Sequence, residues 1–166
     1  SKGGCGKTTI STNLAAALSS GPDAGSVCLL DYDLETGDVA IALQMDPTRT
    51  VSDALGMQGG LDERAMASLV VPYKANMDAL LAPTKPSDAE FVSAALAGEL
   101  VQVAASMYDY VVIDAPPAFT DVVLVAVAVG EVEHAAGHEQ RGAVRSHVAQ
   151  PRGELGHRPV ALELQL

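Results

Sequence analysis

The first nine residues, SKGGCGKTT, combine three glycines with two lysines and two threonines. Backbone N–H groups can surround a phosphate only where no side chain blocks the approach, which favours glycine at Gly3, Gly4 and Gly6. Lys7 would then place its ammonium group against the β- and γ-phosphates, and Thr8 would offer a hydroxyl to Mg²⁺. The stretch therefore predicts a loop that binds a nucleoside triphosphate, the alternative being a glycine-rich turn that holds two lysines by chance.

Such a loop leads into a helix, whose N-terminal partial positive charge faces the same anion. Residues 9–18, TISTNLAAAL, predict that helix. A strand normally delivers the chain to the loop, yet the given sequence starts at Ser1. We therefore expect a fragment that lacks the strand before the loop and the C-terminal strands of the sheet.

Two apolar runs further along the chain end in aspartate. Residues 26–30, SVCLL, are followed by Asp31 and Asp33, and residues 110–113, YVVI, are followed by Asp114. Continuous apolar runs are typical of buried parallel strands, and open α/β sheets bind ligands at the carboxyl ends of their strands. Each pattern alone also fits an acidic turn or an ordinary strand end. Their order behind the glycine loop favours a shared site.

Strands and helices alternate between these landmarks. Thr50 and Ser52 are candidate caps of a short helix, residues 61–71 have helical spacing, residues 77–83 predict a strand ended by proline, and a long helix is expected from Ser87 onward. The apolar face of that long helix is expected to comprise Phe91, Ala95, Leu96, Leu100, Val103, Ala104 and Met107. The alternation predicts an α/β fold with a mostly parallel sheet flanked by helices.

Residues 2–9 resemble the deviant Walker A motif of the ParA/MinD superfamily of P-loop ATPases, Lys-Gly-Gly-x-Gly-Lys-Thr-Thr, although the general phosphate loop has glycine where this chain has Ser1. The resemblance implies ATP and Mg²⁺ as cofactors. It implies that the nucleotide is bound by Lys2, Gly3, Gly4, Cys5, Gly6, Lys7, Thr8 and Thr9.

In this superfamily an Asp-x-Asp element and a Walker B aspartate complete the site. The resemblance implies that Thr8, Asp31 and Asp114 hold the metal, directly or through its water shell. Asp33 is expected to orient the attacking water.

The same resemblance implies catalysis by an ATP-dependent homodimer. Lys7 would act within its own subunit, Lys2 would reach the partner's nucleotide, and Asp33 would complete the catalytic set. ATP would hold the dimer together and hydrolysis would release it.

Residues 33–55 and 80–90 are similar to the CpaE-like proteins of the superfamily. These belong to its pilus-assembly and septum-placement branch, which also contains the MinD-like proteins. This implies an ATPase that positions pilus or division machinery through a protein partner. The formal net charge of −11 argues against direct binding to nucleic acid, and so against the DNA-partitioning ParA proteins.

Composition changes abruptly near residue 120. Every aromatic residue and every lysine lies before that point, and every histidine lies after it. We expect a truncated ATPase domain over residues 1–130 and an atypical tail over residues 131–166, which is either frame-shifted or a disordered linker. His134 and His138 share a helical spacing but have no further ligand nearby in the sequence, which disfavours a metal site.

The remaining expectations concern location and rival functions. A cytoplasmic protein, recruited only indirectly to the inner face of the membrane, is expected. No cysteine follows Cys28, which excludes a relative that binds a cluster as the nitrogenase iron protein does. Three alternatives stay open: a nucleotide-binding scaffold without catalysis, a nonfunctional gene fragment, and a bacterial tyrosine kinase, which the lack of any tyrosine after Tyr110 disfavours.

Overall fold

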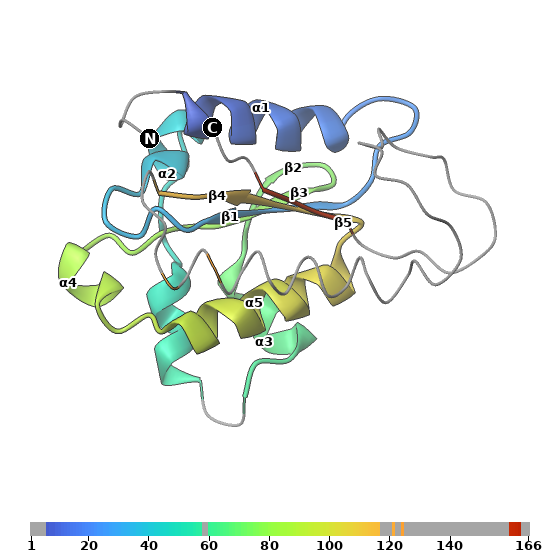
Figure 1. Ribbon diagram of the computed structural model, residues 1–166. Helices are drawn as coiled ribbons and strands as arrows, with labels where there is room; N and C mark the ends of the chain where they lie inside the picture. The colour runs from blue at the N-terminus through green and yellow to red at the C-terminus, as the bar shows by residue number, and fades with distance from the viewer. Residues whose placement is uncertain (1–5, 58–59, 117–120, 122–123, 125–159, 164–166) are drawn as a thin grey trace.

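The structure is a computed structural model that describes residues 6–57, 60–116, 121, 124 and 160–163. A five-stranded sheet in the order β2-β3-β1-β4-β5 crosses the molecule between two layers of helices (Figure 1). The strands are β1 (Val27–Asp31), β2 (Val71–Lys74), β3 (Met77–Leu80), β4 (Tyr110–Asp114) and β5 (Val160–Glu163). All neighbouring pairs are parallel except β2 and β3, which confirms the mostly parallel α/β fold.

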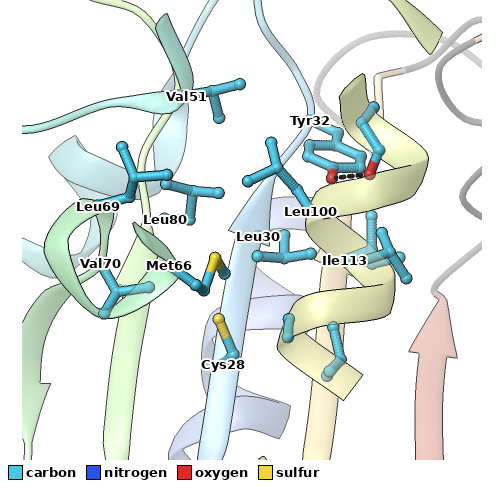
Figure 2. Close-up of a cluster of buried hydrophobic side chains, with 14 of the residues drawn as sticks. Cys28, Leu30, Tyr32, Val51, Met66, Leu69, Val70, Leu80, Leu100 and Ile113 are labelled. Atoms are coloured by element: carbon cyan, nitrogen blue, oxygen red, sulfur yellow. Dashed lines mark hydrogen bonds between the residues drawn. The ribbon is translucent and has the colours of Figure 1, made fainter. Parts of the chain in front are cut away.

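Strand β1 is buried on both faces and has a neighbour at each edge. Successive side chains of a strand point to opposite faces. Cys28 and Leu30 accordingly lie in the hydrophobic cluster drawn in Figure 2, whereas Val27 and Leu29 lie in a second cluster on the other face. This two-sided burial explains why the segment has no polar alternation.

Helices α1 (Lys7–Leu18) and α2 (Asp38–Leu43) cover one face of the sheet (Figure 1). The predicted helix after the glycine loop is therefore confirmed, beginning two residues earlier than expected. Ala15 of α1 is fully buried in the same cluster as Val39 and Leu43 of α2. The helix that follows the loop is thus fixed by its packing against β1 and its neighbours.

The other face is covered by α3 (Glu63–Leu69) and α5 (Ala94–Met107), with a 3₁₀ helix, η1 (Val51–Gly56), before them and the short α4 (Pro86–Ala89) between them. Thr50 precedes η1 as expected, and its backbone N–H donates to Asp53 Oδ2 at 2.7 Å. Ser52 lies inside η1 and is not its cap.

The expected apolar face of the long helix is partly wrong. Phe91 is 68% exposed, and Ala95 is also exposed. The helical conformation is interrupted between α4 and α5. Ser93 caps the start of α5, where its side chain accepts a hydrogen bond from the backbone N–H of Leu96. The buried side of α5 therefore comprises Ala97, Gly98, Leu100, Val101, Ala104 and Ala105.

The sequence also carries no clear sign of the hairpin between β2 and β3. Its turn contains Asn76, whose φ of 63° lies in the left-handed region that asparagine tolerates. Val71 pairs with Ala79 across the two strands. The hairpin adds the single antiparallel edge to the described sheet.

Strand β5 comes from the segment expected to be an atypical tail. It pairs in parallel with β4, from Tyr110 with Val160 to Ile113 with Glu163. The rest of residues 131–166, including His134 and His138, lies outside the described residues, so the domain boundary at residue 130 stays a prediction. Within the part of the chain that is described, no helix is both long and apolar enough to traverse a bilayer.

Candidate nucleotide and magnesium site

Asp31 and Asp114 occupy equivalent positions at the carboxyl ends of two adjacent parallel strands. They are register partners at the last pair between β1 and β4. Their side chains are 0% and 1% exposed, respectively. The structure therefore brings together two acidic residues that are far apart in the sequence, at the edge where sheets of this class bind ligands.

The carboxylate of Asp31 is already engaged in holding its surroundings. Its Oδ1 accepts a hydrogen bond from the backbone N–H of Asp33, and its Oδ2 accepts one from the backbone N–H of Val39 in the first turn of α2, both at 3.2 Å. Burial, followed by the nearby charge of Asp114, raises the pKa of Asp31 to about 8, although the two amide hydrogen bonds lower it. Asp31 thus orders the loop that carries Asp33.

Asp114 differs, because both of its carboxylate oxygens are buried without a hydrogen-bond partner among the described residues. Burial is the main reason that the pKa of Asp114 is raised, and Asp33 raises it further. The hydroxyls of Thr8 and Ser11 and the ammonium of Lys7 lower it. Neither hydroxyl makes a well-formed hydrogen bond to the carboxylate. The hydroxyl of Ser11 donates instead to the carbonyl of Thr8 at 3.1 Å.

These two open oxygens meet the chemical requirement for a cation. A buried carboxylate is costly unless it is paired, hydrogen-bonded or bound to a metal. Among the described residues no three His, Cys, Asp or Glu side chains lie together as a complete metal-binding set. Mg²⁺ commonly uses one or two protein ligands and completes its shell with phosphate oxygens and water. Asp114 and the nearby Thr8 fit that donor set, and Asp31 lies beside them.

The end of the glycine loop is described from Gly6 onward. Gly6 has a φ of 87°, in the left-handed region, and no atom of the described residues lies within 4 Å of where a Cβ would stand. Its carbonyl accepts the backbone N–H of Ile10 at 2.9 Å, so α1 starts directly after it. Lys7 is buried at 9% exposure, Thr8 is half-buried and the side chain of Thr9 is exposed. Glycine is required here for backbone conformation.

The hydroxyl of Thr8 and the charges of Asp33 and Lys7 all act on the pKa of Asp114. Asp33 is half-buried, and its carbonyl accepts the N–H of Gly37 at 2.8 Å in the turn that leads to α2. The other expected site residues, Lys2, Gly3, Gly4 and Cys5, lie outside the described residues. Their roles, like those of the described site residues, stay predictions.

Ser11 belongs to this site, although no sequence motif singles it out. It is fully buried and lies one helical turn after Lys7. Residues four apart share a face of a helix, so this spacing is the signal that identifies it. The hydroxyl of Ser11 lowers the pKa of Asp114, which links this residue to the site.

Most of the chain is similar to known proteins. Residues 1–136 match the ParA family model, described as NUBPL iron-transfer P-loop NTPase. The tyrosine-protein kinase wzc of Salmonella typhi is 33% identical over 128 residues, which cover 75% of this chain and 17% of that protein. The chain therefore spans only a small part of this curated relative.

Solved structures with a similar fold include two that are 26% identical in sequence. A ParA family ATPase from Chlorobium tepidum TLS is 26% identical with a TM-score of 0.70, and the match covers 76% of this chain and 53% of that one. Cobyrinic acid a,c-diamide synthase from Mycobacterium smegmatis, solved with a bound ATP analogue and magnesium, is 26% identical with a TM-score of 0.58 and covers 77% and 52%. The glycine-loop helix, the paired aspartates and the family match together place this chain in the ParA family of P-loop NTPases, within the ParA/MinD superfamily.

Proposed function

We propose that this chain binds Mg²⁺ and ATP at the carboxyl end of β1 and β4 and hydrolyses ATP to ADP and phosphate. The observation that carries the proposal is the buried carboxylate of Asp114, whose two oxygens have no hydrogen-bond partner among the described residues, while the hydroxyl of Thr8 and the charge of Lys7 lower its pKa. A phosphate-bound Mg²⁺ would satisfy those oxygens. The solved relative with an ATP analogue and magnesium supports the same pair of ligands.

We assign some site residues to binding of the phosphates and the metal, and Asp33 to activation of the attacking water. The phosphates would be bound by Lys7 and by the backbone of Gly3, Gly4, Cys5 and Gly6. The N-terminus of α1 would add its own partial positive charge. Thr8 and Asp114 would hold the metal, which neutralises phosphate charge when bound.

Asp33 would orient the attacking water. The amide of Asp33 is held by Asp31 Oδ1, so Asp31 contributes chiefly by positioning this loop beside the metal. Lys2 would contact the nucleotide of a second subunit, and Thr9 would contribute its backbone to the loop. Hydrolysis would then be linked to release of an ATP-dependent homodimer.

The output of this cycle is proposed to be the positioning of pilus or division machinery. Support comes from residues 33–55 and 80–90, which resemble the CpaE-like branch. The chain would act in the cytoplasm, reach the inner face of the membrane only through a protein partner, and bind no nucleic acid directly. The net charge of −11 fits the last point, because a phosphate backbone would be repelled.

A tyrosine kinase is the second candidate, favoured by the 33% identity to the kinase wzc. Both functions need the same Mg²⁺-ATP site and differ in the acceptor of the γ-phosphate. Incubation with γ-labelled ATP separates them. Label in free phosphate supports hydrolysis, whereas label in tyrosine of the chain or of a Glu-Tyr copolymer supports the kinase.

The main experiment measures phosphate release and ATP-driven dimerisation in Lys7→Ala and Lys2→Ala. Lys85→Ala serves as the control, because Lys85 is exposed on the N-terminal side of α4. We expect both activities to be lost in Lys7→Ala and the release step to be lost in Lys2→Ala, with Lys85→Ala unchanged. Unaltered turnover and dimerisation in both site variants would refute the assignment of ATP hydrolysis to this loop. ATP binding without phosphate release at any protein concentration would favour a scaffold.

A further inference from the structure

We infer that Tyr32 is a positioning residue that fixes Asp33 for catalysis by tying the end of β1 to helix α5. The inference rests on the proposed ATPase function. Tyr32 stands between Asp31 and Asp33, and its side chain is 1% exposed. Nothing in the motif itself requires a tyrosine at this place, since only the two flanking aspartates carry the expected chemistry.

Tyr32 connects three elements of the fold. Its hydroxyl donates a buried hydrogen bond to the carbonyl of Ala97 in α5 at 2.7 Å, shown as a dashed line in Figure 2. Its backbone N–H donates to the carbonyl of Asp114, at the end of β4, at 2.9 Å. The residue that immediately precedes Asp33 is thus held on its backbone side by β4 and on its side-chain side by α5.

The hydroxyl does more here than fill space. The ring lies among apolar residues that include Leu30, Leu100 and Ile113, and phenylalanine would fill the same volume. Burial raises the pKa of Tyr32, so its hydroxyl stays a donor throughout the neutral range. A buried hydroxyl without a partner is unfavourable, which favours the ring orientation in which the hydroxyl reaches the carbonyl of Ala97.

This orientation matters for the chain that follows. From Asp33 the backbone turns away from the sheet, with the N–H groups of Thr36 and Gly37 donating to the carbonyl of Asp33. Asp31 holds the amide of Asp33 from one side. Tyr32 fixes the residue just before Asp33 through its bonds to Ala97 and to the carbonyl of Asp114, so a shift of α5 relative to β1 would move the Asp33 carboxylate relative to Asp114.

Tyr108 provides a matched control. Its hydroxyl donates to Asp78 Oδ2 at 2.7 Å, the same length as the Tyr32 bond. Tyr108 directly follows α5, and Asp78 lies in β3, so neither belongs to the Asp31–Asp33 loop. Tyr32→Phe and Tyr108→Phe thus each remove one oxygen and one tyrosine hydrogen bond from the full chain.

The first readout is kinetic. We expect Tyr32→Phe to lower kcat for ATP hydrolysis roughly tenfold and to leave KM within about twofold, because a small misplacement of a catalytic group has a large effect on rate. Tyr108→Phe should leave both constants unchanged. A kcat in Tyr32→Phe equal to that of the wild type, or reduced only as much as in Tyr108→Phe, would overturn the inference.

The second readout needs no nucleotide. Hydrogen exchange of the amides between residues 33 and 39 should be faster in Tyr32→Phe than in the wild type, and unchanged in Tyr108→Phe. Equal exchange in all three proteins would overturn the link between α5 and the loop. If the wild type hydrolyses no ATP, the proposed function fails, while the exchange result still decides whether Tyr32 holds the loop.

Discussion

Replacing Asp114 by asparagine is expected to stabilise the nucleotide-free chain, and to do so more strongly at pH 7.5 than at pH 5.5. The pKa of Asp31 rises from 3.8 to about 8 on folding, and the pKa of Asp114 is also raised. Between those pH values the folded chain binds more protons than the unfolded chain. Stability is therefore greatest below the unfolded pKa and falls as the pH rises toward the folded pKa.

The size of this effect follows from Asp31. Each bound proton that separates the folded from the unfolded state changes the free energy of unfolding by about 1.4 kcal/mol per pH unit. Over the two units from pH 5.5 to 7.5, Asp31 alone should lower the stability of the wild type by about 2–3 kcal/mol. The neutral amide in Asp114→Asn would remove the second-largest cause of the Asp31 shift, and we therefore expect this decrease in stability to become smaller.

Urea unfolding of the nucleotide-free chain at pH 5.5, 6.5 and 7.5 measures this directly. Asp23→Asn, at an exposed position in the turn after α1, controls for the change in net charge. The carboxylate of Asp114 accepts no hydrogen bond from the described residues that the variant would lose, so a stability gain is the expected sign. An Asp114→Asn chain with the same pH slope as the wild type would refute the coupling of the two aspartates.

Two further predictions concern the opposite end of the sheet. Asp109→Ala should lower the free energy of unfolding by about 2–3 kcal/mol in urea titrations. The reason is that Asp109 Oδ2 accepts hydrogen bonds from both the backbone N–H and the hydroxyl of Ser26, at 2.7 and 2.8 Å. An unchanged urea midpoint would contradict this. Gly25→Ala should lower the free energy of unfolding by about 1–3 kcal/mol, measured by thermal unfolding. The new Cβ would lie 2.7 Å from Cε2 of Tyr110. A melting temperature equal to that of the wild type would show that the ring moves aside without cost.

The strands and helices that build the site can be predicted from sequence because their signals are local. The glycine loop, the helix after it and the two apolar runs that end in aspartate each occupy a few consecutive residues. The parallel sheet then brings the strand ends to one edge. Asp31 and Asp114 are predicted to meet there, and they are register partners.

Other features depend on contacts between distant segments and have no local signal. The bond from Tyr32 to Ala97 joins residues 65 positions apart, and the role of Asp31 in holding Val39 appears only once α2 is placed. Phe91 has the apolar character of a buried residue but is exposed, because the helix is interrupted before α5. Hydrophobicity alone therefore overestimates the buried face.

The most direct test of the account is the effect of Mg²⁺ on ATP affinity, measured by calorimetry with a slowly hydrolysed ATP analogue. We predict that Mg²⁺ tightens binding to the wild type and to Asp23→Asn, and that Asp114→Asn loses most of this gain while still binding the nucleotide through its glycine loop. Equal Mg²⁺ dependence in Asp114→Asn and the wild type would contradict the assignment of Asp114 to the metal.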